Sequence, residues 1–382
     1  MGEDRKIGIL TFHKSINYGS VLQAWALQKM ISLLGYQSEI IDYEPKEYYK
    51  IYGTKVLASV DFKRKVKTLL KFRKKEKLQF DKFDEFRNNE LKLSKQKYNY
   101  NLQMDYLNEK YDMLITGSDQ IWNINLLDCD PIFFLPFNFK GKKIAYACSI
   151  NNGNVNERYT SEWLKQWIND YDFISIREKS GVDKIKSFLE NDKKIYNALD
   201  PTLLLSKNDF ISLVGKPLRK EKYIFLYNMW TKNEAIQAAR ILSEKLNLPV
   251  YTILNQIDLI RVSKCNMNHI NVDIKNIGPK DFLNYIYYSS YTITDSFHGT
   301  AFSIIFNKEF FTLNSHLDKT TYKNDERLEN ILNHDMLRER FVTLDEIKSY
   351  NLNKKIDYEV INKYRMSLAE KSIHLLKSAI EG

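Results

Sequence analysis

The chain has 382 residues, which is long for one small core and suits two medium-sized domains. Its hydrophobic fraction of 43%, with 25 Tyr and 21 Phe, supplies enough apolar surface for folded cores and excludes a mainly disordered protein. The formal net charge of +10 raises the question of an anionic partner, such as nucleic acid, a membrane surface or an acidic polymer.

The N-terminal region alternates strand and helix patterns. Residues 6–12, KIGILTF, form an apolar run that is typical of a strand buried on both faces of a parallel sheet. Residues 21–35 then repeat apolar side chains at helical spacing and end at Gly35, and residues 37–43 predict a second strand. This order predicts a doubly wound α/β domain.

The positive charge is concentrated between Asp61 and Lys97, where 14 Lys or Arg accompany 6 Asp or Glu. Leucines and phenylalanines interleaved at helical spacing predict amphipathic helices in this basic segment. A run of charge usually forms a solvated helical face. The alternative is a surface that faces an anionic bilayer or a charged polymer.

Strand and helix patterns resume after the basic segment. Residues 112–122 and 142–150 each predict a strand that ends in a polar loop, and residues 171–189 predict a strand, a turn and a helix. Pro201 and a loss of periodicity place a domain boundary between residues 200 and 209. The pattern restarts with strands at 222–229, 249–254, 291–294 and 309–314, helices at 231–246 and after Gly278-Pro279, and a terminal helix at 357–380.

These elements predict an α/β fold with two Rossmann-like domains and a cleft between them. The N-terminal domain is assigned to residues 1–205, with the basic helical insertion at about 46–110. The C-terminal domain is assigned to residues 206–350. Residues 351–382 are predicted to form a terminal helix, which can pack back on the N-terminal domain.

Ligands of open α/β sheets bind beyond the carboxyl ends of the strands, so the loops after predicted strands are the candidate sites. In NYGS, Ser20 or Asn17 can cap the following helix, or the free backbone N–H groups around Gly19 can hold an anion. In TGSDQIWN, Ser118 and Asp119 offer hydrogen bonds, while Trp122 either packs in a core or stacks on a sugar ring.

Two further loops carry charge or a proton-transfer group. Arg177 follows an apolar strand and either pairs with an acid or captures a carboxylate or phosphate with its planar guanidinium. In TITDSFHGT, Ser296, Gly299 and Thr300 lie where a strand becomes a helix, a position that favours anions. His298 lies in that loop, and its ordinary pKa of ~6.5 suits proton transfer near neutrality.

Seven stretches together resemble the polysaccharide pyruvyl transferase family. They occur in family order and span about Ile7 to Asn314: ILTFHKSINYGSVLQAWAL, DMLITGSDQIWN, IAYACSI, ISIREKSG, LDPTLLL, GPKDFLNYI and TDSFHGTAFSIIFNKEFF. The resemblance implies a fold like the two-domain GT-B glycosyltransferases. It also implies transfer of the enolpyruvyl group of phosphoenolpyruvate to a sugar of a bacterial-type surface polysaccharide or its lipid-linked precursor, forming a pyruvate ketal.

The resemblance also assigns residues. Arg177 matches the Arg of the family's SxRE stretch and His298 the His of SFHG, so both are the expected catalytic residues that serve the donor. The scheme requires no metal and no cofactor beyond phosphoenolpyruvate as donor substrate. Family members often carry a further Arg after the SFHG helix, for which Arg327 is the nearest Arg here and Lys319 the nearest Lys.

Other functions remain as alternatives. A GT-B glycosyltransferase that uses a nucleotide sugar would share the fold, and a family member with lost or altered chemistry would share the motifs. A basic nucleic-acid-binding protein is less favoured, because the phenylalanines of the basic segment have core-like helical spacing. The absence of a leader pattern and of a run of ~20 apolar residues predicts a cytoplasmic protein, held peripherally at the inner face of an anionic membrane if the acceptor is lipid-linked.

Overall fold

The computed structural model describes residues 5–45, 79–98, 104–126, 128–151, 161–189, 192–228, 233–253, 270–273, 277–314 and 326–382. The chain divides into two compact units. The first unit comprises Met1–Thr54, Arg87–Leu205 and Arg365–Gly382, and the second comprises Lys55–Phe86 and Ser206–Tyr364. The change of unit after Leu205 falls in the interval where the sequence loses its periodicity.

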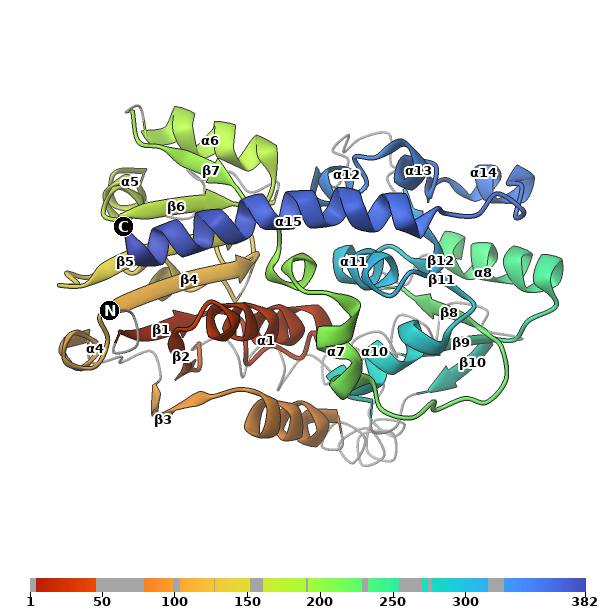
Figure 1. The fold of residues 1–382 in the computed structure, drawn as a ribbon, viewed down its shortest axis with the longest axis horizontal. Helices are drawn as coiled ribbons and strands as arrows, with labels where there is room; N and C mark the ends of the chain where they lie inside the picture. Colours follow the sequence, from red (N-terminus) through yellow and green to blue (C-terminus); the bar gives the residue numbers. More distant parts are fainter. Residues whose placement is uncertain are drawn as a thin grey trace, which may run out of the picture. The chain divides into compact units, whose positions relative to one another are not determined.

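The first unit contains one parallel sheet with the strand order β3-β2-β1-β4-β5-β6-β7 (Figure 1). Its strands are β1 (Lys6–Leu10), β2 (Gln37–Tyr43), β3 (Leu93–Tyr98), β4 (Met113–Asp119), β5 (Lys142–Cys148), β6 (Phe173–Ile176) and β7 (Ile195–Asn197). The chain winds outward from β1 on one side through β2 and β3, and on the other side from β4 to β7. The winding therefore reverses between β1 and β4, which is the switch point of a doubly wound sheet.

The helices of the first unit explain why its central strands are apolar on both faces. They are α1 (Tyr18–Leu33), α4 (Met104–Lys110), α5 (Ser161–Asn169) and α6 (Lys179–Leu189), with short 3-10 helices η1 (Pro131–Phe134) and η2 (Pro201–Leu204). From Ile7 to Leu10 every residue of β1 is buried, as the continuous apolar run predicts. A large cluster of buried side chains around Leu114, Trp122 and Phe133 forms one core of this unit.

The second unit contains another parallel sheet, with the order β10-β9-β8-β11-β12-β13. Its strands are β8 (Ile224–Tyr227), β9 (Val250–Ile253), β10 (Ile270–Asp273), β11 (Tyr291–Thr294), β12 (Glu309–Leu313) and β13 (Phe341–Val342). Its helices are α7 (Lys207–Val214), α8 (Asn233–Leu246), α10 (Pro279–Tyr288), α11 (Phe297–Ile305), α12 (Glu326–Ile331), α13 (Asp335–Arg338) and α14 (Leu344–Ser349). Here the winding reverses between β8 and β11.

The basic segment differs from the sequence prediction at its end. Residues 46–78 lie outside the described residues, and residues 79–90 are helical as predicted. Residues 93–98, however, form β3, the edge strand of the first sheet, so the prediction of helix was incorrect there. Lys95 and Lys97 are exposed on this edge, where lysines discourage pairing with another chain. The two lysines therefore suit an edge strand. The interpretation from helical spacing missed this strand.

The terminal helix α15 (Tyr358–Glu381) contributes its residues from Arg365 onward to the first unit. Arg365 Nη1 donates to the carbonyl oxygens of Leu203 at 2.9 Å and Leu205 at 2.8 Å. Ser372 Oγ accepts the backbone N–H of Leu199 at 3.0 Å. These bonds fix the segment around η2. None of the helices in the described ranges combines the length and apolarity that a membrane crossing needs.

Candidate functional site

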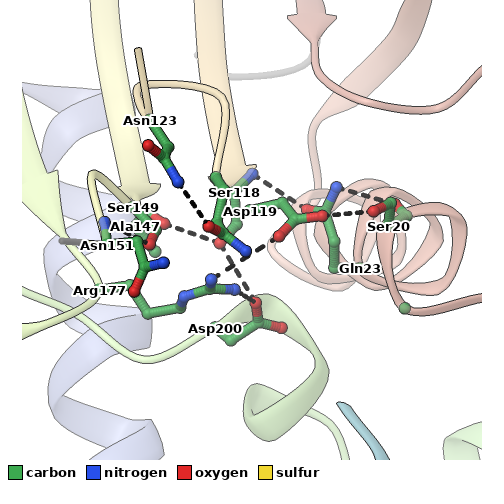
Figure 2. A network of polar contacts seen from close by, with 12 residues as sticks. Ser20, Gln23, Ser118, Asp119, Asn123, Ala147, Ser149, Asn151, Arg177 and Asp200 are labelled. Atoms are coloured by element: carbon green, nitrogen blue, oxygen red, sulfur yellow. Dashed lines mark hydrogen bonds and ion pairs between the residues drawn. The ribbon is translucent and has the colours of Figure 1, made fainter. Parts of the chain in front are cut away.

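A group of buried polar side chains lies at the carboxyl end of the first sheet (Figure 2). We call it the strand-end network and define it as Ser20, Ser118, Asp119, Arg177 and Asp200. Ser20 belongs to the first turn of α1, and Ser118 and Asp119 end β4. Arg177 follows β6, and Asp200 caps η2. The network therefore joins both sides of the switch point between β1 and β4.

The network is held by hydrogen bonds and ion pairs. Ser20 Oγ donates to Asp119 Oδ2 at 2.5 Å, across the switch point. Arg177 Nη1 donates to Asp200 Oδ2 at 2.8 Å, and its Nη2 lies 3.6 Å from Asp119 Oδ1. Ser118 Oγ lies 3.3 Å from the same Asp200 oxygen. The structure thus brings three of the predicted site residues together. It adds Ser20, which the sequence suggested only as a helix cap, and Asp200, which the sequence did not single out.

The backbone at the end of β4 directs Asp119 into this network. Asp119 has a φ of 68°, in the left-handed region that aspartate tolerates better than most residues. Gly117 has a φ of 126°, and a Cβ there would lie 2.0 Å from the carbonyl oxygen of Tyr146. Only glycine fits at residue 117, and the turn that it permits aims the next two side chains at the switch point.

The charges of the network do not favour an anion. The single guanidinium of Arg177 faces the carboxylates of Asp119 and Asp200, and both acids are buried. The adjacent Glu178 is buried too, and its Oε1 accepts the backbone N–H groups of Ile150 and Asn151, both at 2.7 Å. Arg177 is therefore already compensated by two acids. Carboxylate oxygens beside hydroxyl groups are better suited to bind donors such as sugar hydroxyls than to bind a phosphate.

Asn17 and Trp122, for which the sequence left a structural and a binding role open, both have structural roles. Asn17 caps α1, because its Oδ1 accepts the backbone N–H groups of Gly19 at 2.9 Å and Ser20 at 3.3 Å. Trp122 is buried, stacks on Phe134 with ring centroids 5.4 Å apart, and donates from Nε1 to a backbone carbonyl. Of the two interpretations left open for Trp122, the structure shows packing in the core.

A second buried ion group lies beyond β1 and β2 and was missed from sequence. His13 Nε2 lies 3.1 Å from Asp42 Oδ1, and Lys14 Nζ lies 2.5 Å from the same oxygen. His13 is completely buried. The sequence gave no sign of this pair, because Asp42 lies near the end of the next strand, 29 residues from His13. Burial alone would raise the pKa of Asp42, but its contacts with His13 and Lys14 outweigh burial and lower the pKa to about 2.

This pKa predicts how stability depends on acid. Because the pKa of folded Asp42 lies below its ordinary value of 3.8, its stabilising contribution is complete above about pH 4 and is lost as the pH falls through about 2. Asp42 contributes about 2 kcal/mol to the free energy of unfolding in this way. Urea unfolding of the wild type and of Asp42→Asn should therefore differ most near neutrality and converge in acid. A difference that stays constant with pH would contradict the assignment.

The switch point of the second unit also carries polar side chains. Tyr227 of β8 pairs in register with Thr294 of β11. Asn228 and Asp295 follow these residues directly, so both come from the same edge of the sheet, and both are buried. Asn228 could not be singled out from the sequence, because it follows β8 with no visible motif.

The loop after β11 leads into α11 through a helix cap. Ser296 is the capping residue, and its Oγ accepts the backbone N–H of Gly299 at 3.4 Å. His298 lies in the first turn of α11 and is only 7% exposed. Its ring packs edge-on against Phe297, with the ring centroids 5.1 Å apart. The imidazole is therefore positioned by the helix start, next to the switch point between β8 and β11.

Gly299 and Thr300 serve the packing of α11. A Cβ at Gly299 would lie 2.3 Å from Thr294 Oγ1, so α11 can approach β11 only with glycine at this position. Thr300 Oγ1 donates to the Ser296 carbonyl at 3.0 Å and lies 2.7 Å from Thr312 Oγ1. The side chain of Thr300 is completely buried and is satisfied within the unit.

Gly299→Ala is expected to destabilise the protein by about 1–3 kcal/mol, because the new methyl group overlaps Thr294. Urea unfolding measures this loss. If the overlap is the cause, Thr294→Ala should offset part of it in the double variant. A Gly299→Ala protein that is as stable as the wild type would show that the close approach is not needed.

The remaining expectations concern a further Arg and metal ligands. Arg327 lies in α12, and Lys319 lies outside the described residues. Within the ranges that the structure describes, no three His, Cys, Asp or Glu side chains group together as metal ligands.

A model of the family described as polysaccharide pyruvyl transferase matches residues 17–316. The matched span contains the strand-end network, α11 and every predicted site residue. No curated protein matches the chain.

Solved structures show the same fold at low identity. S. aureus MnaA in a structure with UDP has a TM-score of 0.52 and 13% identity, over 99% of this chain and 96% of that chain. Methanocaldococcus jannaschii UDP-GlcNAc 2-epimerase, in complex with UDP-GlcNAc and UDP, has a TM-score of 0.52 and 12% identity over 99% and 100%. Neisseria meningitidis UDP-GlcNAc 2-epimerase, bound to UDP-GlcNAc, has a TM-score of 0.50 and 9% identity over 99% and 97%. These likenesses confirm the predicted fold class, with two parallel α/β sheets in Rossmann-like units of the GT-B type.

Proposed function

Because the chain belongs to the polysaccharide pyruvyl transferase family, we propose that it moves the enolpyruvyl group of phosphoenolpyruvate onto a sugar. The acceptor in this proposal is a surface polysaccharide or its lipid-linked precursor, and the product is a cyclic pyruvate ketal. The observation that carries the proposal is the position of His298, a buried imidazole in the first turn of α11 beside the switch point of its sheet.

The proposed reaction balances without a redox partner. A proton adds to the methylene carbon of phosphoenolpyruvate and makes the methyl group. One sugar hydroxyl then bonds to the central carbon and releases its own proton. A second hydroxyl of the same sugar forms the other carbon–oxygen bond as the bond to phosphate breaks, and inorganic phosphate leaves with the remaining proton. Two hydroxyl protons are thus exchanged for the new methyl proton and the phosphate proton.

We assign to His298 one of these proton transfers, either to the methylene carbon or to the departing phosphate. An imidazole is the side chain whose ordinary pKa lets it give and take protons near neutrality. The first turn of a helix also favours negative charge, which phosphoenolpyruvate carries on both its phosphate and its carboxylate.

The strand-end network has a different proposed task. Arg177 was expected to serve the donor, but Asp119 and Asp200 already occupy its guanidinium. We therefore assign Arg177 as a positioning residue that holds Asp119 at the switch point. Asp119 would accept hydrogen bonds from hydroxyl groups of the acceptor sugar. Ser118 is completely buried and its Oγ donates to the carbonyl oxygen of Ala147 at 2.7 Å, so it supports the network from within. Asn17 and Gly19 support this site indirectly, by starting α1 where Ser20 can reach Asp119.

A titration of the purified chain distinguishes this proposal from its main rival. Phosphoenolpyruvate and UDP-GlcNAc are titrated separately by calorimetry, and phosphoenolpyruvate is expected to bind. The rival is a glycosyltransferase that uses a nucleotide sugar. It is tested because solved structures of the same fold contain UDP. Binding of UDP-GlcNAc without binding of phosphoenolpyruvate would overturn the proposed donor and favour the rival.

A further inference from the structure

A basic cavity lies at the amino-terminal end of the first sheet, the end opposite the strand-end network. Its volume is about 540 Å³, within the range of cavities that hold sugar-sized ligands. The wall is formed at the amino ends of β1 and β2, beside β3 and at the end of α4. Its charged lining residues are Lys6, Lys92, Lys95, Lys110 and Glu39.

Among the residues that the structure describes, no acid pairs with three of the four lysines. Lys6, Lys92 and Lys95 form no ion pair with any residue in the described ranges. Lys110 pairs with Glu39, which also accepts a hydrogen bond from the hydroxyl of Tyr111 at 2.5 Å. Two other acids are nearby: Asp112, whose Oδ2 accepts the backbone N–H of Lys6 at 2.8 Å, and Glu90, which lines a neighbouring cavity that shares Lys92. Within the lining of the basic cavity itself, four ammonium groups accompany the carboxylate of Glu39, and the cavity attracts anions.

The basic cavity is separate from the strand-end network. Tyr111, which lines the cavity, comes just before β4, and Asp119 ends that strand. An extended chain rises about 3.3 Å per residue, so the two places lie roughly 25 Å apart along one strand. A ligand of the basic cavity would not occupy the proposed acceptor site.

The lining also indicates the kind of anion. An adjoining cavity of about 460 Å³ shares Gln37, Ser38 and Lys92 with the basic cavity and adds the side chains of Asn89, Lys29 and Glu90. Gln28 also lines it, but its amide is bonded to the backbone of Lys92. Together the two cavities offer amides and hydroxyls, the groups that bind sugar hydroxyls, beside the lysines that bind acid groups. A concave site of this kind admits a narrow chain and excludes a broad, flat surface such as a bilayer.

We propose that the basic cavity binds a saccharide that carries carboxylate or phosphate groups. The need for negative charge follows from the lysines alone, whereas the choice of a saccharide over free phosphate also draws on the proposed function. Lys92 and Lys95 belong to the basic segment between Asp61 and Lys97. The part of that segment that the structure describes would therefore bind a charged polymer.

The test measures binding, so its outcome is independent of pyruvyl transfer. An oligogalacturonate, a neutral malto-oligosaccharide of the same length, inorganic phosphate and anionic phospholipid vesicles are each titrated against the full chain at low and high salt. The oligogalacturonate is expected to bind, and more weakly at high salt. The double variant Lys92→Gln/Lys95→Gln should weaken its binding about tenfold, since two exposed charges are lost.

A matched control removes the same charge elsewhere in the first unit. Lys186 on α6 and Lys371 on α15 are exposed and line neither cavity, so Lys186→Gln/Lys371→Gln should bind the oligogalacturonate as the wild type does. If both double variants weaken binding of the oligogalacturonate equally, the effect comes from net charge alone, and the proposal is overturned. So would binding of phosphate alone with the same dependence on Lys92 and Lys95, equal affinity for the neutral saccharide, or vesicle binding without saccharide binding.

Discussion

His298→Gln is expected to slow phosphate release from phosphoenolpyruvate by about 10²- to 10⁴-fold, the usual contribution of a side chain that transfers a proton in the rate-limiting step. Glutamine keeps a polar group at the start of α11 but cannot exchange a proton near neutrality. Because the change acts on a chemical step, turnover should fall far more than the affinity for the donor. Phosphate release with a polysaccharide acceptor and calorimetric titration of phosphoenolpyruvate measure the two quantities.

A second histidine provides the control. His374 is exposed on α15, so His374→Gln should leave both quantities unchanged. Urea unfolding of both variants shows whether the fold is preserved. If folded His298→Gln protein turns over at a near-normal rate, the imidazole does not transfer a proton in the reaction. Equal losses of turnover and stability would instead indicate that the side chain only supports α11.

Much of the fold could be predicted because its signals are local. The apolar run of β1 and the Gly-Pro start of α10 lie within a few residues of the elements that they specify. The strand predicted at residues 37–43 is β2 to the residue. The edge strand β3 was missed because its lysines resemble the basic helices before it, and only pairing with β2 makes those residues a strand.

The candidate site could be predicted only in part, for a related reason. Asp119 and Arg177 were visible because each follows an apolar strand. Their partners were not, since Ser20 is 99 residues from Asp119 in sequence and Asp200 is 23 from Arg177. A single sequence shows which residues end strands, but the sheet order decides which of those ends meet. The sequence left open whether Arg177 pairs with an acid or captures an anion, and the structure gives it two acids as partners.

Arg177→Ala is expected to lower the free energy of unfolding by about 3–5 kcal/mol, the cost of removing one partner from a buried ion pair. Asp200 is completely buried and Asp119 nearly so, and without the guanidinium their carboxylates would repel each other in a place with little water. Urea unfolding measures the loss. Arg338→Ala is the control, because Arg338 is exposed and lies 3.8 Å from an exposed Asp335.

One further measurement separates lost compensation from lost packing. Asp200→Asn removes one of the opposing charges but keeps an oxygen for Thr202, so the double variant with Arg177→Ala should recover part of the stability. If the second substitution does not restore stability, the guanidinium acts by filling space, and its role in holding Asp119 at the switch point loses its electrostatic basis.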